Sequence, residues 1–270
     1  MSEACKAAAF FDLDKTLIEG SSGLHFVRSA YRAGMISRRQ VARDLWANLR
    51  FRMQGSTDAA TDAVRERILT WMEGRRRQDI ARLGPRALAG ILPLLYPQML
   101  EVAWDHQDAG RPVYIVTAAS QDLADQLSHV LELDGGIGMR FELRDGVYTG
   151  RPDGPFTYRE GKATAIRELA ERAGIDLAAS YAYSDSESDL PMLRAVGNPV
   201  AVNPDQELRA VARSEGWPIM HFDKLGRRLK WLGALGTVVL VGGAGGYLTG
   251  RLRPRRTFRR GRSLPARLRA

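Results

Sequence analysis

Two hydrophobic patterns divide the chain near residue 97. Before that point, apolar residues recur at helical spacing, as at Leu24, Val27 and Tyr31, and such spacing is typical of amphipathic helices. Single glycines and a Gly-Pro pair interrupt this block, which predicts several helices rather than one. The block of about 70 residues is too long for an ordinary loop between a strand and a helix. We therefore expect a helical insertion that forms a lid, with helices around Leu24 to Tyr31 and at 38–53, 59–74 and 77–90.

The rest of the chain alternates between strand-like and helix-like segments. A buried strand at residues 7–11 precedes the insertion, and strands and helices follow each other in turn after Pro97. The elements expected there are helix 97–109, strand 112–117, helix 120–132, a hairpin at 139–149, helix 161–174, strand 180–184, helix 189–196, strand 199–202, helix 205–215 and strand 218–221. This alternation predicts an α/β fold with a doubly wound, mostly parallel, Rossmann-like sheet. The predicted core comprises residues 7–18 and 97–222, and the inserted α-helical cap comprises residues 19–96.

Two carboxylates close the first strand. The apolar run from Ala7 to Phe11 leads directly to Asp12 and Asp14, and side chains two residues apart on a strand share one face. In open α/β sheets, ligands bind at the carboxyl ends of the strands. We therefore expect the chemistry of the protein at this position.

Later strand ends and helix starts carry further polar groups. Thr117 closes an apolar strand and is followed by Ala118, a small residue that lets a backbone amide approach an anion next to a helix N-terminus. Lys162 lies near the start of a helix, and Asp185 and Asp189 follow another strand. Each of these residues by itself is more simply a cap, a turn former or a solvated side chain. Only their joint occurrence indicates a site.

Together these residue types meet the needs of phosphoryl transfer through an aspartyl phosphate. A carboxylate that attacks phosphorus splits one difficult displacement into two easier ones. Two anions approach each other only with a counter-charge, which an octahedral Mg²⁺ held by carboxylates and waters supplies. A lysine and a hydroxyl hold phosphate oxygens, while a second carboxylic acid protonates the leaving oxygen and then activates water.

The order and spacing of these residues resemble the four motifs of the haloacid dehalogenase-like (HAD) hydrolases, in the branch of the phosphoserine phosphatases. The motifs here are Asp12-Leu-Asp14-Lys-Thr16, Thr117, Lys162 and Ser184-Asp185-Ser-Glu-Ser-Asp189. The resemblance covers about residues 7 to 222, and four motifs in order are far more specific than any one of them.

The resemblance implies a role for each residue. Asp12 would be the nucleophile and Asp14 the general acid/base, which separates phosphatases from related cation-pumping ATPases that carry a threonine at the second position. The phosphate-binding residues would be Thr117, Ala118 and Lys162. The residues expected at Mg²⁺ are Asp12, Asp14 through its main-chain carbonyl, Asp185 and Asp189.

Two positions depart from the pattern of this branch. The metal-binding Asp185 is flanked by Ser184 and Ser186 where the branch commonly has glycines. The glutamate that holds the amino group of phosphoserine would fall near Ser21, with Glu19 two residues away. The resemblance therefore implies a small phosphomonoester as substrate, of which phosphoserine is only one candidate.

The basic charge is confined to the end of the chain. The chain has 40 Lys and Arg and 31 Asp and Glu residues, for a formal charge of +9. Thirteen of the basic residues and none of the acidic ones follow Asp223, so the preceding residues carry −4 and the tail +13. The high pI thus belongs to the tail, and nucleic acid is not expected as a partner of the body.

The start of the chain favours a cytoplasmic catalytic domain. It contains a single cysteine, Cys5, and the charged residues Glu3 and Lys6 stand where a signal peptide would have its apolar core.

The tail itself combines an apolar segment with an arginine-rich one. Residues 231–250 carry no charge, although seven of these 20 residues are glycine, and a helix of that length matches the thickness of a bilayer core. Residues 251–270 hold nine arginines, a composition suited to anionic lipid headgroups. A glycine-rich linker with a disordered tail is the alternative. We expect residues 231–270 to associate with an anionic membrane surface at the inner face of the cell membrane. The segment would lie in the interface or be re-entrant. A helix that spans the membrane would place the arginines outside the cell, against the positive-inside rule.

Three functions stay open from the sequence. The first is a Mg²⁺-dependent phosphomonoester hydrolase that acts through Asp12. The second keeps this chemistry but acts on a lipid phosphate, in the manner of a phosphatidylglycerophosphatase. The third is a non-catalytic regulator that senses a phosphorylated ligand, which the intact motif set disfavours.

Overall fold

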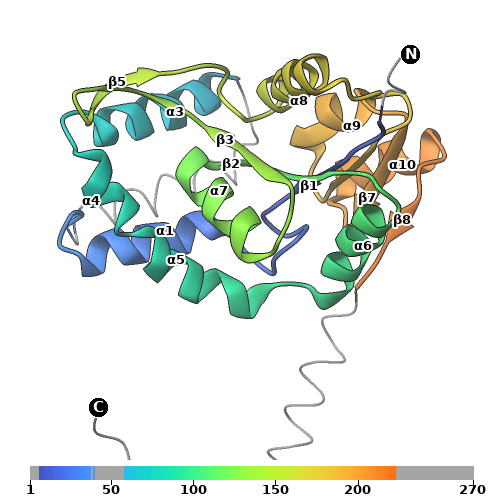
Figure 1. The fold of residues 1–270 in the computed structure, drawn as a ribbon, viewed down its shortest axis with the longest axis horizontal. Helices are drawn as coiled ribbons and strands as arrows, with labels where there is room; N and C mark the ends of the chain where they lie inside the picture. Colours follow the sequence, from blue (N-terminus) through green and yellow to red (C-terminus); the bar gives the residue numbers. More distant parts are fainter. Residues whose placement is uncertain (1–5, 38, 40–57, 223–270) are drawn as a thin grey trace, which may run out of the picture. The chain divides into compact units, whose positions relative to one another are not determined.

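A six-stranded parallel sheet forms the centre of the molecule (Figure 1). The computed structural model describes residues 6–37, 39 and 58–222. The strands lie in the order β3 (Gly135–Met139), β2 (Val113–Ser120), β1 (Ala9–Asp12), β6 (Tyr181–Ser184), β7 (Asn198–Val202) and β8 (Ile219–Met220), and each neighbouring pair is parallel. The predicted α/β fold with a doubly wound parallel sheet is confirmed.

Helices cover both faces of this sheet because each central strand is apolar on both sides. Phe10 and Phe11 are adjacent in β1 and fully buried, so they point to opposite faces. Phe10 belongs to the core cluster shared with the helices α8 (Glu160–Ala173), α9 (Leu190–Arg194) and α10 (Gln206–Ser214). Phe11 contacts His106 of α6 (Pro97–Asp108) on the other face, and α7 (Gln121–Val130) packs against β2 and β3.

A buried histidine, His106, lies on α6 where this helix packs against the sheet. His106 is 4% exposed, and its Nε2 lies 2.8 Å from the hydroxyl of Tyr183. Arg111 Nε donates to His106 Nδ1 at 2.7 Å, so Nδ1 is the acceptor nitrogen of a neutral ring whose Nε2–H faces Tyr183. Burial, followed by the charge of Arg111, lowers the pKa of His106 to about 4. His106 is therefore a neutral, hydrogen-bonded side chain in the interior of the protein.

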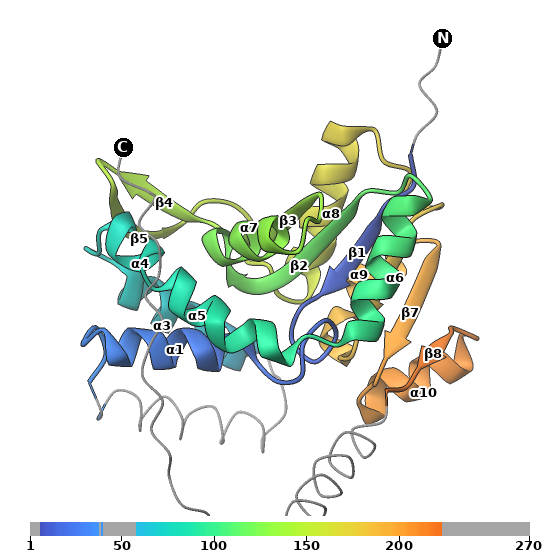
Figure 2. The same cartoon turned by 60° about the horizontal axis from the view of Figure 1, so that its bottom comes forward.

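The segment between β1 and α6 is helical, as the pattern predicted. Its described elements are α1 (Ser22–Arg32), α3 (Asp58–Met72), α4 (Arg77–Ala81), α5 (Gly84–Ile91) and the 3₁₀ turn η1 (Leu92–Leu94). The helices α1 and α5 lie side by side (Figure 2). Most of the helix expected at 38–53 lies outside the described residues.

A β-hairpin from later in the chain joins these helices. It consists of β4 (Phe141–Arg144) and β5 (Val147–Pro152). Tyr148 exchanges backbone hydrogen bonds of 2.9 Å with Gly74 and Arg75, just after α3. The division into cap and core at residue 96 stays a prediction. That prediction assigned the hairpin to the core, but these backbone hydrogen bonds join the hairpin to the helical segment.

Two elements differ from the sequence prediction for local reasons. The single helix expected at 77–90 is two helices, α4 and α5, because Pro85 lies in the first turn of α5, where its missing N–H leaves no bond unmade. The helix expected at 189–196 begins as a 3₁₀ turn, η2 (Glu187–Asp189), and continues as the shorter α9.

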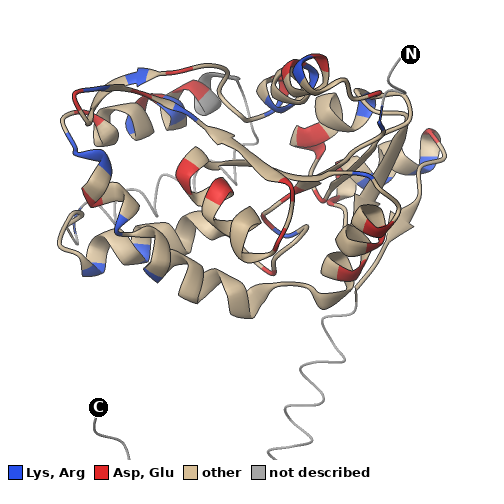
Figure 3. Cartoon of the chain, in the orientation of Figure 1, with Lys and Arg blue, Asp and Glu red and all other residues tan. Residues whose placement is uncertain are grey.

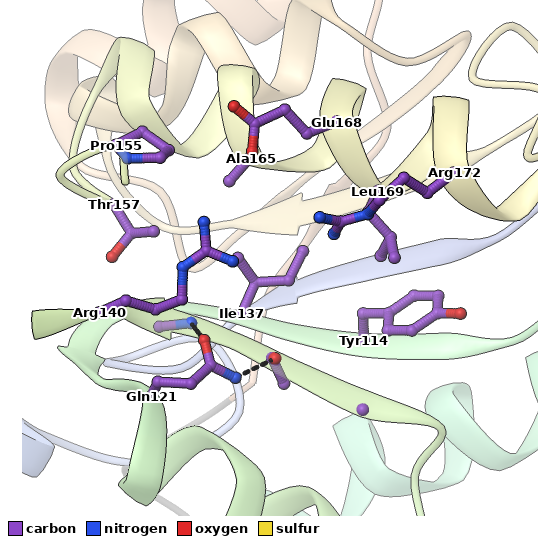
Figure 4. Close-up of a pocket in the computed structure, with 13 residues that line it drawn as sticks. Tyr114, Gln121, Ile137, Arg140, Pro155, Thr157, Ala165, Glu168, Leu169 and Arg172 are labelled. Atoms are coloured by element: carbon purple, nitrogen blue, oxygen red, sulfur yellow. Dashed lines mark hydrogen bonds between the residues drawn. The ribbon is translucent and has the colours of Figure 1, made fainter. Parts of the chain in front are cut away.

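The edge strand β3 was missed because its sequence, Gly135-Gly-Ile-Gly-Met139, has low strand propensity. The glycines are required by packing, since a Cβ at Gly136 would lie 2.6 Å from the backbone of Ala124. The side chain of Gln121 donates to Gly136 O at 2.7 Å and accepts from Gly138 N at 2.8 Å (Figure 4). The side-chain amide of Gln121 thus satisfies backbone groups that a further strand would otherwise pair with, which leaves the edge of the sheet less available for pairing with another chain.

The predicted membrane segment 231–250 and the Arg-rich tail 251–270 lie outside the described residues. Within the part that is described, no helix combines the length and the apolar character that crossing a bilayer requires.

Candidate active site

The topology brings three strand ends to one point. β1 lies between β2 and β6, and the chain visits β2 on one side before it crosses to β6 on the other. The order of strands therefore reverses at β1, and such a reversal leaves a crevice at the carboxyl ends of the strands. Asp12 ends β1 and Ser184 ends β6, while Thr117 lies one residue beyond the partner of Asp12 on β2. The strand-end residues predicted from the sequence thus meet at one edge.

Lys162 connects two of the predicted carboxylates. Its Nζ donates to Asp12 Oδ1 at 2.6 Å and to Asp189 Oδ2 at 2.7 Å. Only 3% of Lys162 is exposed, at the start of α8. Burial alone would lower the pKa of Lys162, but the carboxylates of Asp12 and Asp189 outweigh it and the net direction is upward. Lys162 is therefore a buried, permanently charged group beside Asp12, and not the solvated helix residue that its position alone suggested.

Asp12 is held in an environment that resists its ionisation. It is 6% exposed. Burial raises its pKa to about 8, Lys162 opposes this, and the nearby Asp189, Asp185 and Asp14 add to it. Thr16, four residues later, donates its hydroxyl to Asp12 Oδ2 at 3.2 Å. One lysine does not neutralise the carboxylates gathered here, so the ionised form of Asp12 requires more positive charge.

The two carboxylates after β6 are buried as well. Asp189 Oδ2 also accepts from Ser184 Oγ at 2.6 Å, whereas its Oδ1 is buried and has no hydrogen-bond partner among the described residues. Burial raises the pKa of Asp185 to about 6, although the ammonium of Lys15 opposes this shift. Ser184, which stands where the branch commonly has glycine, thus orients Asp189 directly.

Lys15 has a contact that the sequence interpretation did not anticipate. Its Nζ lies 3.2 Å from Asp185 Oδ2, although 49% of the lysine side chain is exposed. Its backbone is in the left-handed region, with φ of 61°, which directs the chain around the turn after β1. Lys15 therefore pairs with a predicted metal ligand.

Asp14 faces the first helix of the insertion. Its Oδ1 accepts from the backbone N–H of Ser22 at 2.7 Å, and its Oδ2 accepts from Ser21 Oγ at 3.3 Å. Asp14 thus occupies a capping position at the N-terminus of α1, where the helix dipole favours a negative charge. Ser21, at the position where the branch places a substrate-binding glutamate, contacts this carboxylate. The sequence offered one signal for this contact, which is the pair of serines at the start of the helix.

The predicted phosphate-binding turn consists of the last residues of β2, from Thr117 to Ser120, directly before α7. Thr117 is 2% exposed, and its Oγ1 accepts from Ala119 N at 3.1 Å. Ala118 is exposed at the turn, and α7 begins three residues later. The turn and the helix N-terminus therefore lie next to each other, as an anion-binding turn requires.

The donor chemistry of the site fits a hard cation. Asp12, Asp185 and Asp189 offer carboxylate oxygens, and the unpartnered Oδ1 of Asp189 is a buried acceptor of the kind that Mg²⁺ satisfies. Among the residues that the structure describes, no three His, Cys, Asp or Glu side chains are gathered tightly enough to share one ion. Lys162 bridges Asp12 and Asp189 instead, so Mg²⁺ at these residues stays a proposal.

Other features of the described structure lie away from this site. A cavity of about 170 Å³ between β3 and α8 is lined by Tyr114, Arg140 and Arg172 among others, and it includes none of the predicted site residues (Figure 4). Lys and Arg residues are spread over α1, α3, α4 and α8, and α3, α4 and α8 also carry acidic residues (Figure 3).

Comparison with known proteins identifies similar chains. The family model described as haloacid dehalogenase-like hydrolase matches residues 9–194. The chain is 39% identical over 246 residues to phosphoserine phosphatase SerB1 of Mycobacterium tuberculosis, covering 90% of this chain and 79% of that protein. It is 31% identical over 222 residues to a histidinol-phosphatase of Neisseria meningitidis, covering 80% and 99%. Among solved structures, a protein of unknown function from Bordetella pertussis matches with a TM-score of 0.71 and 28% identity, covering 80% of this chain and 99% of the other.

Proposed function

The chain belongs to the haloacid dehalogenase-like hydrolases and is a phosphatase of that family, and from this premise we propose that it hydrolyses phosphomonoesters through an aspartyl phosphate on Asp12. The observation that carries this proposal is the position of Lys162 Nζ, 2.6 Å from Asp12 Oδ1 and 2.7 Å from Asp189 Oδ2, at the strand end where the sheet order reverses. A carboxylate beside a buried cation is suited to attack a phosphate that the same cation neutralises.

In the first step, an Asp12 carboxylate oxygen forms a bond to phosphorus while the bond from phosphorus to the alcohol oxygen breaks. Asp14 donates its proton to that leaving oxygen. In the second step, the Asp14 carboxylate takes a proton from a water molecule that attacks the acyl phosphate, which releases inorganic phosphate and frees Asp12. Thr117, Ala118 and Lys162 hold the phosphate oxygens during both steps.

We propose Mg²⁺ as the cofactor. It would be held by Asp12, Asp185, Asp189 and the main-chain carbonyl of Asp14, and when bound it supplies the positive charge that lets two anions react. The raised pKa of Asp12, about 8, supports this assignment, because the nucleophile must be ionised to attack. Lys162 alone does not supply that charge.

Phosphate release from a panel of phosphomonoesters, measured with Mg²⁺ and with a chelator, tests the proposal. Phosphoserine and histidinol phosphate belong in the panel because similar proteins carry these names. Metal-dependent turnover that disappears in Asp12→Asn is the expected result. Turnover that survives this substitution would refute the assignment of Asp12, and silence on every ester would favour a phospho-ligand sensor.

We propose further that residues 231–270 hold the catalytic domain at an anionic membrane surface at the inner face of the cell membrane. The support is the sequence alone, an uncharged segment of 20 residues followed by nine arginines. Co-sedimentation of the full chain with vesicles containing phosphatidylglycerol should exceed that of a variant with all nine arginines replaced by glutamine. Turnover of a lipid phosphate in such vesicles, without turnover of soluble esters, would select the lipid-phosphatase alternative.

A further inference from the structure

A large cavity adjoins the site at the helical insertion. Its volume is about 870 Å³, and its walls come from α1, α3, the end of β2 and the start of β4. Most of the lining side chains are apolar, among them Leu24, Val27, Ile68, Trp71, Leu123 and Met139. The volume lies within the range of sites that accept whole organic molecules, roughly 300–1,000 Å³.

One end of this cavity reaches the phosphate-binding turn. Ala118, Ala119 and Ser120 line it there, directly after Thr117. Ser21, whose hydroxyl donates to Asp14, lines it at the N-terminus of α1. A phosphate placed at the turn would therefore extend its alcohol into the apolar part of the cavity, with the leaving oxygen on the side of Asp14.

The exposure of Leu24 indicates what this part of the cavity accepts. Leu24 is 60% exposed on α1, although it lines the cavity next to the site. Exposed apolar surface in a cavity wall gains free energy when an apolar group covers it. A compact, doubly charged alcohol such as serine would leave this surface uncovered.

The charged residues of the wall do not offset this apolar character. Arg75 stacks over Trp71 at 4.3 Å, and its Nε donates to the carbonyl of Trp71 at 2.5 Å, so its guanidinium lies against the indole ring. Glu66 and Arg67 are exposed and neighbouring residues of opposite charge on α3. A ligand body that reaches Leu24 and Trp71 meets apolar and aromatic surface.

We infer that the substrate is a phosphomonoester of a primary alcohol that carries a large apolar or aromatic body. This inference rests on the proposed phosphatase function and adds the class of alcohol to it. Leu24 and Trp71 are the residues that set the preference.

The test uses phosphate esters of three alcohols that are similar as leaving groups. Differences in kcat/KM among them therefore report binding of the body of the alcohol and not the chemistry of the leaving oxygen. Ethyl phosphate, 2-phenylethyl phosphate and 2-naphthylethyl phosphate are compared with phosphoserine, on the full chain with Mg²⁺. We expect kcat/KM to rise along the three alcohols by about tenfold or more in total, and to exceed the value for phosphoserine.

Two matched substitutions locate the effect. Leu24→Ser should lower kcat/KM for 2-naphthylethyl phosphate by about tenfold and leave that for ethyl phosphate unchanged. Leu143→Ser is the control, because Leu143 is also an exposed leucine, at 40%, but does not line the cavity; it should change neither value.

Each outcome separates this inference from the function on which it rests. Equal turnover of all three alcohols, a preference for phosphoserine, or an equal effect of Leu24→Ser on every ester would overturn the apolar substrate class and leave the phosphatase intact. Absence of turnover on every ester would overturn the proposed function together with the inference.

Discussion

Replacing Lys162 with methionine tests the electrostatic arrangement of the site most directly. The substitution keeps the length and apolar stem of the side chain and removes the charge that lies 2.6 Å from Asp12 and 2.7 Å from Asp189. The lysine side chain is only 4% exposed. Removing one partner of a buried ion pair costs about 3–5 kcal/mol, because the remaining charges are left uncompensated. We expect the free energy of unfolding to fall by that amount at pH 8 in the presence of a chelator.

Lys15→Met provides the matched control. Lys15 also pairs with a carboxylate of the site, Asp185, but at 3.2 Å and with 49% of its side chain exposed. Solvent screens such a pair, so the same substitution should cost less than about 1 kcal/mol.

The loss in Lys162→Met should also depend on pH. Burial already raises the pKa of Asp12 to about 8 against the opposing effect of Lys162, and without the lysine this carboxyl should take up a proton still more readily. The unmodified protein already binds this proton below about pH 8, so the two folded proteins differ in protonation only above that pH, up to the higher Asp12 pKa of the variant. The deficit of the variant relative to the unmodified protein should therefore shrink as the pH falls from about 9.5 to 8.

Urea unfolding followed by tryptophan fluorescence at pH 8 and pH 9.5 measures both effects. The reasoning would be refuted by an equal deficit at the two pH values, or by a Lys15→Met variant that is destabilised as much as Lys162→Met. Phosphate release by Lys162→Met should fall by about a hundredfold or more, the scale found when one preorganised donor to a reacting anion is removed.

Three further predictions follow from the same contacts. Asp14→Asn should slow phosphate release by at least about a hundredfold while leaving the melting temperature within a few degrees, and unchanged turnover would remove its acid/base role. Lys15→Gln should tighten Mg²⁺ binding by about threefold in a calorimetric titration, because the ammonium no longer competes for Asp185, whereas Lys15→Arg should not. The pKa of His106, lowered to about 4, keeps the ring neutral in the fold while the unfolded chain takes up a proton below about pH 6.5. Acidification from pH 7.5 to 5 should therefore change the stability of the unmodified protein less favourably than that of His106→Gln, by about 2 kcal/mol in urea unfolding, and equal changes in the two proteins would contradict this.

Much of the fold followed from local patterns. Apolar runs ahead of Asp12, Thr117 and Asp185 predicted buried parallel strands, and the helical spacing before residue 97 predicted the insertion. The edge strand β3 escaped prediction because its glycines serve a close approach to α7, a requirement that exists only in the folded protein. The pairing of the hairpin with the helical segment was hidden for a similar reason, since its backbone hydrogen bonds join residues about 70 positions apart in the sequence.

The sequence by itself determined which chemical groups the candidate site contains, because carboxylates, a lysine and a hydroxyl are residue types in a fixed order. Only the tertiary structure decided how they are paired. Lys162 reaches Asp12 across 150 positions of sequence, Asp14 caps α1, and Lys15 reaches Asp185. These pairings depend on where the strands lie in the sheet, and burial then sets the pKa of each group. A sequence pattern carries residue identity and spacing, whereas distance and desolvation arise only when the chain is packed.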